Sequence, residues 1–229
     1  MGRVDPVAPL TREQLDPAVL FDAVSMEVVG GSRINTRGHS WQDRWAAGGG
    51  QLCTWMAVAD GITGGGSGAA AAQCAVEMAT HVLGMGVAAE ASVIAAFAAA
   101  RAAVNPWYLN SSAGGTTLCV MVADTRRAVV GWVGDSAAFA LVEGRLERIT
   151  PARSGSALTH WVGDGTVEPP QLRSFELSGP AVLVLATDGL ELDGIEWDGL
   201  DPRGFVGRAL TQCRVPSGDD ATLVVASGR

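Results

Sequence analysis

Lysine is absent from this sequence, and all 16 of its basic residues are arginine. This absence excludes chemistries that depend on a lysine amine: the phosphate loop of Walker-type nucleotide hydrolases, the strand lysine of protein kinases, and Schiff-base catalysis. If the protein handles phosphate, it must therefore hold it with arginine, with backbone amides or with metal ions.

Cysteine and histidine are also scarce. The cysteines have no Cys-x-x-Cys spacing and each lies in an apolar run, which predicts buried thiols in a reducing compartment; they are Cys53, Cys74, Cys119 and Cys213. The three histidines show neither the HExxH nor the HxH spacing of a histidine-based zinc centre. No run of 18 residues is free of both charges and turn signals, and the first 20 residues do not resemble a signal peptide. We therefore expect no membrane span and a cytoplasmic location.

Acidic residues outnumber basic ones by 24 to 16, which gives a net charge of −8. Such a surface repels phosphate backbones and no basic patch is visible, so nucleic acid is not an expected partner. A hydrophobic content of 48% is enough to bury a sizeable core. We expect a flexible lead-in over residues 1–20, one domain over residues 21–229, and a monomer.

Two long helical patterns and one short one lie among groups of short, apolar, β-prone runs. Helices are predicted over 67–83, 88–104 (ended by Pro106) and 204–213, and strands over 23–29, 52–59, 116–122, 128–133, 137–142, 146–149, 181–186 and 221–226. The four strands within 116–149 read as an antiparallel meander, and residues 151–180 read mostly as loop. This order indicates an α+β fold, and a Rossmann-like sheet is a poorer alternative.

Carboxylates stand at the ends of several predicted strands. Asp60, Asp135 and Asp188 each follow an apolar run, Asp219 directly precedes one together with Asp220, and Asp43 lies in a loop. Each alone is typical of a turn, but together they can converge at one rim of a sheet. Converging carboxylates repel one another unless a cation neutralises them, and hard ions such as Mg²⁺ or Mn²⁺ prefer oxygen ligands.

Seven motifs in order resemble the metal-dependent protein phosphatase family, also called protein phosphatase 2C, in its bacterial branch. The resemblance covers about residues 25–227 and rests on GSRINTRGHSWQD (31–43), VADG (58–61) with GGGSG (64–68), GGTT (114–117), VGDS (133–136), LTHWVG (158–163), ATDGL (186–190) and DDATLVV (219–225). It implies a four-layer α-β-β-α sandwich of two antiparallel sheets flanked by helices.

The resemblance also implies an activity: hydrolysis of phosphoserine and phosphothreonine in proteins by a water activated by two Mn²⁺ or Mg²⁺ ions. Asp60 would bridge the ions, with the Gly61 carbonyl on one of them and Asp188 and Asp219 on the other. Asp43 would act through a water molecule. Asp135 would either hold a third ion or only shape its turn. Phosphorylated proteins are the implied partners, with a cognate Ser/Thr kinase in bacterial signalling.

The chain departs from the family pattern at several positions. Gln42 stands where some members have a glutamate ligand, and the flap that many members insert is nearly absent before Leu158. The phosphate-holding arginine has two candidates, Arg33 and Arg37. His160 is expected to be structural, with protonation of the leaving group as its alternative.

Two other functions stay open. Gln42 and the short flap favour a catalytically weak, phosphatase-like binding or sensing module. An amide-cleaving hydrolase of similar four-layer build would need a nucleophile at a freed N-terminus, which Met1-Gly2 does not offer without processing.

Overall fold

The computed structural model describes residues 19–20, 26–34, 41–49, 52–62, 67–108, 114–152, 158–165, 169–177, 181–193, 195–197, 199, 201–212 and 219–228. Their elements follow the order β1 (Val19–Leu20), β2 (Met26–Arg33), β3 (Arg44–Gly49), β4 (Thr54–Ala59), α1 (Gly68–Leu83), α2 (Glu90–Tyr108), β5 (Leu118–Ala123), β6 (Arg127–Val133), β7 (Ala137–Val142), β8 (Arg145–Arg148), β9 (Gln171–Glu176), β10 (Val182–Ala186), α3 (Pro202–Gln212) and β11 (Ala221–Gly228).

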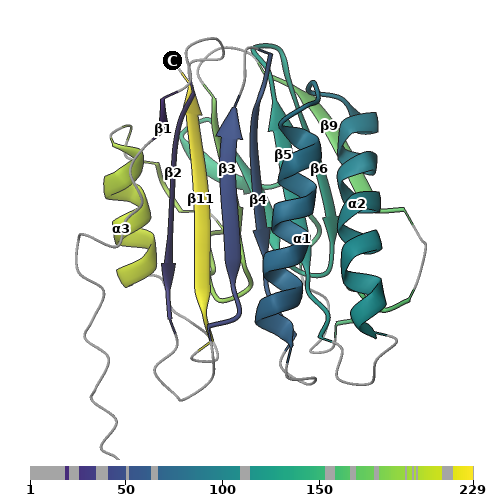
Figure 1. The fold of residues 1–229 in the computed structure, drawn as a ribbon. Helices are drawn as coiled ribbons and strands as arrows, with labels where there is room; N and C mark the ends of the chain where they lie inside the picture. The colour runs from purple at the N-terminus through teal and green to yellow at the C-terminus, as the bar shows by residue number, and fades with distance from the viewer. Residues whose placement is uncertain are drawn as a thin grey trace, which may run out of the picture.

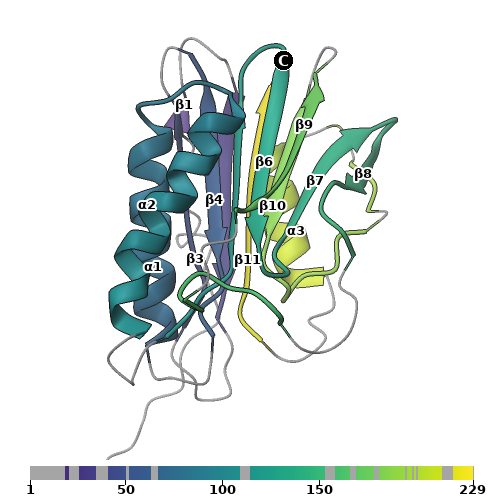
Figure 2. The ribbon, with the colours of Figure 1, turned by 90° about the vertical axis from the view of Figure 1, so that its right-hand side faces the viewer.

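The elements stack in four layers. One sheet has the strand order β1-β2-β11-β10-β7-β8 and the other has the order β3-β4-β5-β6-β9, and all neighbouring strands are antiparallel. Helices α1 and α2 cover the second sheet, while α3 lies on the outer face of the first (Figure 1). Figure 2 shows the layers edge-on. The expected α-β-β-α sandwich is confirmed.

Alternating strand residues supply the three hydrophobic cores that join these layers. In β4, Met56 and Val58 point between the sheets, whereas Ala57 and Ala59 point toward the helices. The helix α1 presents fully buried alanines to its sheet, and small side chains let the helix axis approach closely. A third core joins α3 to the first sheet.

The strand register brings distant chain segments to one rim. Arg44 at the start of β3 pairs with Ala59 at the end of β4, so Asp43 and Asp60 leave the second sheet at the same edge. In the first sheet, Ala221 at the start of β11 pairs with Arg33 at the end of β2. Asp188 and Asp219 therefore emerge at this rim as well, because β10 ends where β11 begins.

The prediction of one meander over residues 116–149 is wrong. Strands β5 and β6 form a hairpin in one sheet, and β7 and β8 form a hairpin in the other. The chain crosses between the sheets at Gly134, whose φ of +98° only glycine adopts readily. The crossing carries Asp135 to the rim.

Besides the two-residue β1, two strands are not predicted by the sequence pattern. β3 occupies a polar, glycine-containing stretch, and β9 lies within residues 151–180, where mostly loop is expected. Both are edge strands, and the largely exposed side chains of β9 give no apolar alternation to detect.

Three further expectations compare directly with the structure. Helix α2 continues past Pro106 to Tyr108. The expected lead-in over residues 1–20 lies outside the described residues except for β1. None of the helices in the described part of the chain is both long and apolar enough to span a membrane.

Candidate active site

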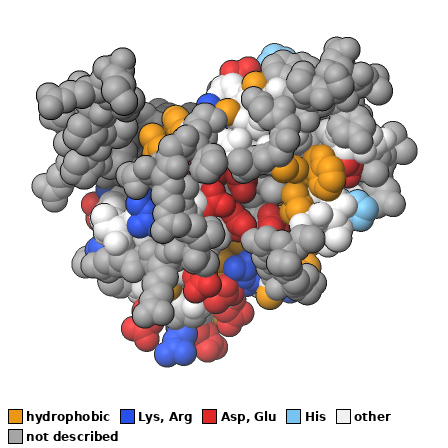
Figure 3. Space-filling model, turned by 90° about the horizontal axis from the view of Figure 1, so that it is seen from below, with side chains coloured by type: hydrophobic (Ala, Val, Ile, Leu, Met, Phe, Trp, Pro, Cys, Tyr) orange, Lys and Arg blue, Asp and Glu red, His pale blue; other side chains and the backbone are white. Residues whose placement is uncertain are grey.

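Asp43, which is buried, and Asp60, which is partly buried, form the centre of the carboxylate rim. Asp43 directly precedes β3 and is only 1% exposed. Asp60 follows β4, and its carboxyl group shares a hydrogen bond with that of Asp43. Seen from the rim in Figure 3, acidic side chains gather at the middle of this face.

Burial and mutual repulsion make both groups hard to ionise. Loss of hydration raises the pKa of Asp43 to about 7, with a further rise from the nearby charge of Asp220. Loss of hydration also raises the pKa of Asp60 far above its usual range. The negative charges of Asp43, Asp188 and Asp219 raise it further. Four carboxylates from four strand ends are thus within electrostatic range of one another.

Threonine hydroxyls form hydrogen bonds with the two central aspartates. Thr187 Oγ1 donates to Asp43 Oδ2 at 2.7 Å, and the amide of Thr222 donates to the same Oγ1 at 3.0 Å. On the other side, the amide of Asp60 donates to Thr117 Oγ1 at 2.9 Å. Thr117 Oγ1 lies 2.8 Å from Ser136 Oγ in turn. These buried hydroxyls fix the orientation of the Asp43 carboxylate and the position of the Asp60 backbone.

Asp219 and Asp220 differ in their surroundings. Asp220 is 7% exposed, and its Oδ2 accepts a hydrogen bond from the backbone amide of Gln42 at 2.7 Å. Asp219 is exposed. Asp220 therefore ties the loop before β3 to the start of β11. Asp219 keeps its carboxylate at the surface of the rim.

Glycines let the loops of the rim approach closely. A Cβ at Gly61 would lie 2.3 Å from the backbone of Gly68, and one at Gly114 would lie 2.3 Å from Ser67. A Cβ at Gly189 would lie only 1.9 Å from the carbonyl oxygen of Asp220. The glycines of these motifs are thus needed for close packing of the loops. Gly61 also forms an isolated antiparallel β-bridge with Thr116.

Of the two arginine candidates, Arg33 ends β2 at the rim, and its buried Nη2 has no hydrogen-bond partner among the described residues. An uncompensated guanidinium nitrogen suits an anion. Arg37 lies outside the described residues.

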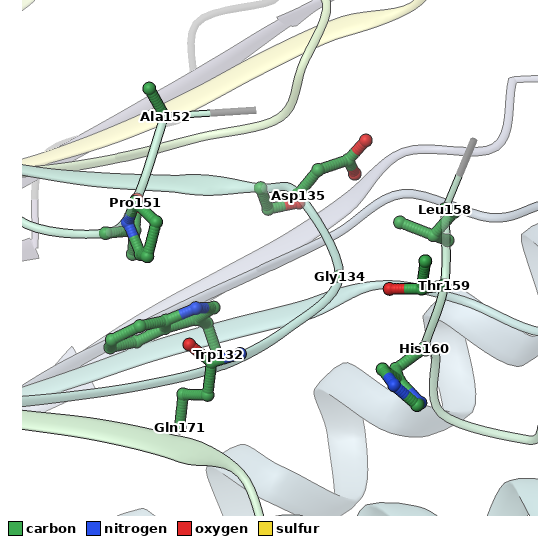
Figure 4. A pocket seen from close by; sticks show the side chains of 11 residues that line it. Trp132, Gly134, Asp135, Pro151, Ala152, Leu158, Thr159, His160 and Gln171 are labelled. Atoms are coloured by element: carbon green, nitrogen blue, oxygen red, sulfur yellow. The ribbon is translucent and has the colours of Figure 1, made fainter. Parts of the chain in front are cut away.

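A hollow of about 150 Å³ adjoins the rim (Figure 4). Trp132 and Gln171 form one side, Leu158, Thr159 and His160 form the opposite side, and Asp135 lies on the loop between them. His160 Nδ1 is 3.8 Å from Asp164 Oδ2, and the imidazole is half-exposed.

The oxygen-only donor set fits a hard divalent cation. A cation would also relieve the mutual repulsion that raises the pKa of Asp60. Within the described residues, however, no three His, Cys, Asp or Glu side chains are already grouped closely enough to hold a metal ion. The rim therefore brings the carboxylates into range of one another without a preformed three-residue cluster.

Sequence reasoning singles out the carboxylates, Asp220 included, but misses the hydroxyl groups beneath them, namely those of Thr187 and Ser136, and the Thr222 amide that holds Thr187. The signal available was a threonine next to an aspartate at the end of a buried strand, as in Thr187-Asp188. The pairing of Thr187 with Thr222 across the sheet, 35 residues apart, could not be read from the sequence.

Comparisons with solved structures give consistent likenesses. The serine/threonine phosphatase PstP/Ppp of Mycobacterium tuberculosis is 22% identical, with a TM-score of 0.69 over 89% of this chain and 98% of that one. The PstP catalytic domain in complex with two manganese ions is 20% identical, with a TM-score of 0.67 over 89% and 97%. The S. agalactiae serine/threonine phosphatase is 17% identical, with a TM-score of 0.69 over 88% and 98%. At these identities the likenesses establish the fold.

The comparison with curated proteins gave no match. The family comparison gave one: the model for protein phosphatase 2C matches residues 30–221. This span begins within β2 and ends at the start of β11, so it contains α1 to α3, the whole carboxylate rim and most of both sheets. The chain belongs to the protein phosphatase 2C family.

Proposed function

We propose that this protein hydrolyses phosphoserine and phosphothreonine in phosphorylated proteins, with two Mn²⁺ or Mg²⁺ ions as cofactors. The observation that carries the proposal is the hydrogen-bonded pair of the buried Asp43 and the partly buried Asp60, whose pKa values are raised by loss of hydration and by the charges of neighbouring carboxylates. A pair of this kind is costly without a cation and is well suited to holding one.

Asp60 and Asp188 would hold the ions, together with Asp219 and the Gly61 carbonyl, and Asp43 would act through a water molecule. When bound, the ions supply Lewis acidity: they lower the pKa of water and offset negative charge on the phosphoryl oxygens. Because the described carboxylates are not yet grouped as three ligands, loading the site should draw the strand ends slightly together.

The chain's own residues supply orientation and charge. Arg33, whose buried Nη2 has no partner in the described part of the chain, would bind the phosphoryl oxygens and orient the phosphorus for in-line attack. Thr187 holds the carboxylate of Asp43, and Thr117 holds the backbone amide of Asp60. Asp135 is the candidate ligand of a third ion or a shaper of its turn, and His160 is a candidate proton donor to the leaving alcohol.

Hydrolysis of p-nitrophenyl phosphate tests this proposal. Purified protein should turn over the ester with millimolar Mn²⁺ and lose activity on chelation. Asp60→Ala should reduce kcat by at least about a thousandfold, because it removes the ligand shared by both ions. A wild-type protein that hydrolyses neither this ester nor phosphopeptides would refute the proposal.

A catalytically weak binding or sensing module is the alternative function. The neutral Gln42 and the lack of a preformed three-residue cluster in the described part of the chain favour it. Calorimetric titration with Mn²⁺ separates the two: an enzyme binds two ions, whereas a weak module binds none, or one ion far more tightly than the other.

A further inference from the structure

Arg44, the first residue of β3, holds the short segment that leads to Asp43. Its Nη1 donates to the carbonyl oxygen of Asp43 at 2.7 Å and to the carbonyl oxygen of Trp41 at 3.1 Å. The guanidinium carbon also lies 4.5 Å from the centre of the Trp41 ring. One side chain therefore contacts both ends of the segment from which the Asp43 carboxylate projects.

The two carbonyl groups lie just beyond the ladder of β3 and β4. The pairing of these strands begins at Arg44 and Ala59, so the ladder does not reach residues 41–43. A backbone carbonyl outside a ladder needs another donor, and a guanidinium group supplies a charged one. The backbone amide of Gln42, between the two carbonyls, donates to Asp220 Oδ2. Side chains thus hold the backbone at three consecutive residues.

Arg44 acts from the face of the sheet opposite to the Asp43 carboxylate. Ala46, two residues further along β3, packs against the core beneath the helices, whereas Trp45 packs between the sheets. Because side chains alternate along a strand, Arg44 lies on the helix side. The carboxylate of Asp43 points the other way, toward Thr187 of the first sheet. Arg44 therefore acts on Asp43 through the backbone.

Arginine has the geometry that this position requires. Its planar guanidinium group stacks on an aromatic ring while its N–H groups donate in the plane of the group, which a lysine ammonium cannot do. Within the described part of the chain, Arg44 forms no ion pair with a carboxylate. Its contacts are the two carbonyl groups and the Trp41 ring.

We propose that Arg44 is a positioning residue for Asp43, which fixes the backbone of residues 41–43 so that the Asp43 carboxylate faces the metal ions in the correct orientation. Asp43 is then held from two sides, since Thr187 contacts its carboxylate and Arg44 contacts its carbonyl oxygen. This inference rests on the proposed function, in which Asp43 acts at the ions through a water molecule.

A double-mutant cycle, measured by calorimetric titration of the metal-free protein with Mn²⁺, tests the inference. Arg44→Ala should weaken Mn²⁺ binding about tenfold, the effect typical of groups that orient metal-site residues from behind. In an Asp43→Asn background the same substitution should change the affinity by less than about twofold, because Arg44 acts through Asp43. Equal losses in both backgrounds would show a general structural role and overturn the proposal.

Two further variants separate geometry from charge. Arg127→Ala removes an exposed arginine at the start of β6 in the same sheet and should leave Mn²⁺ affinity and turnover of p-nitrophenyl phosphate unchanged. Arg44→Lys keeps the charge without the planar group and should lose nearly as much affinity as Arg44→Ala. Wild-type affinity in Arg44→Lys overturns the proposal, and this variant decides alone if Arg44→Ala does not fold. A loss in Arg127→Ala as large as that in Arg44→Ala also overturns it.

Activity separates this inference from the proposed function. At saturating Mn²⁺, kcat of Arg44→Ala for p-nitrophenyl phosphate should fall about tenfold, while the inhibition constant of inorganic phosphate should stay at the wild-type value. Weaker inhibition by phosphate would mean that Arg44 contacts the substrate, which overturns a positioning role. An active wild type that Arg44→Ala matches in affinity and rate overturns this inference alone. A wild type that neither binds Mn²⁺ nor hydrolyses a phosphate ester overturns the proposed function, and this inference with it.

Discussion

At the scale of single residues, the carboxylates of the rim depend on neutral side chains. Asp43 is buried, and its Oδ2 accepts a hydrogen bond from Thr187, a residue that belongs to the other sheet. Thr187 in turn accepts a hydrogen bond from the amide of Thr222 and so completes a chain from β11 to Asp43. A ligand or water-orienting carboxylate held in this way is already aligned before any ion arrives.

Thr187→Val tests the importance of this contact. Removing the hydroxyl deletes a hydrogen bond that lowers the pKa of Asp43 and leaves the carboxylate free to turn. We expect Mn²⁺ affinity to fall about tenfold, in the range found for residues that support metal ligands.

Calorimetry on the metal-free protein measures that affinity without any assay of activity. Thr187→Ser keeps the hydroxyl and serves as the control, with affinity close to that of the wild type. Equal affinity in Thr187→Val and the wild type would show that the contact does not position Asp43.

At the scale of elements, helices α1 and α2 and most strands were predictable from the sequence. The α1 pattern of buried alanines at helical spacing and the apolar run of β10 between Ala181 and Asp188 leave little choice of structure. β9 was not predictable, because its pattern of exposed residues gives no alternation. The division of residues 116–149 between two sheets was not predictable either. A turn has the same sequence pattern whether the strand after it joins the sheet of the preceding strand or the other sheet.

The candidate site was predictable in part for a similar physical reason. An aspartate directly after an apolar strand is visible locally, so Asp60 and Asp188 stand out. Other features of the site depend on contacts between distant segments. They are the burial of Asp220, its hydrogen bond from the backbone amide of Gln42, and the paired hydroxyls of Thr117 and Ser136. Such contacts are set by the packing of whole elements and leave no local pattern.

The junction of β10 and β11 makes a prediction about packing. Gly189→Ala would place a Cβ 1.9 Å from the Asp220 carbonyl oxygen and should destabilise the protein by about 2–4 kcal/mol, because backbone atoms must move.

Gly207→Ala is the matched control, since a Cβ there meets nothing within 4 Å inside α3. This change should stabilise the protein by about 0.5–1 kcal/mol, the usual gain of alanine over glycine in a helix. Urea unfolding of both variants provides the measurement. Equal midpoints for Gly189→Ala and the wild type would contradict the tight junction.

At the scale of the whole molecule, the carboxylate centre links folding stability to pH and to metal. In the metal-free protein the pKa of Asp43 is raised from 3.8 to about 7, so the folded state keeps a proton that the unfolded chain has lost between these values. The resulting stabilisation is complete below about pH 4 and disappears as pH rises toward 7. The raised pKa of Asp60 acts in the same direction.

The Tm of the metal-free protein should therefore fall between pH 5 and pH 7.5, by several degrees if the change amounts to a few kcal/mol. Saturating Mn²⁺ should reverse the slope, because metal and protons compete for the same carboxylates.

Thermal unfolding followed by circular dichroism checks both curves. The control is Asp43→Asn, which removes one of the two titrating groups and should make the metal-free curve less steep, with the remaining slope due to Asp60. A metal-free wild type whose Tm rises steadily over this range would contradict the assignment of buried, protonated carboxyls.

The carboxylates of the rim are shared between the two sheets: Asp43 and Asp60 flank strands of one, while Asp188 and Asp219 flank strands of the other. Ions held by all four would link the two sheets at this end of the sandwich. Separating the sheets there would then require the ions to lose ligands from one of them. Amide hydrogens near the rim should accordingly exchange far more slowly in the loaded protein, while those at the opposite end of the sandwich would change little.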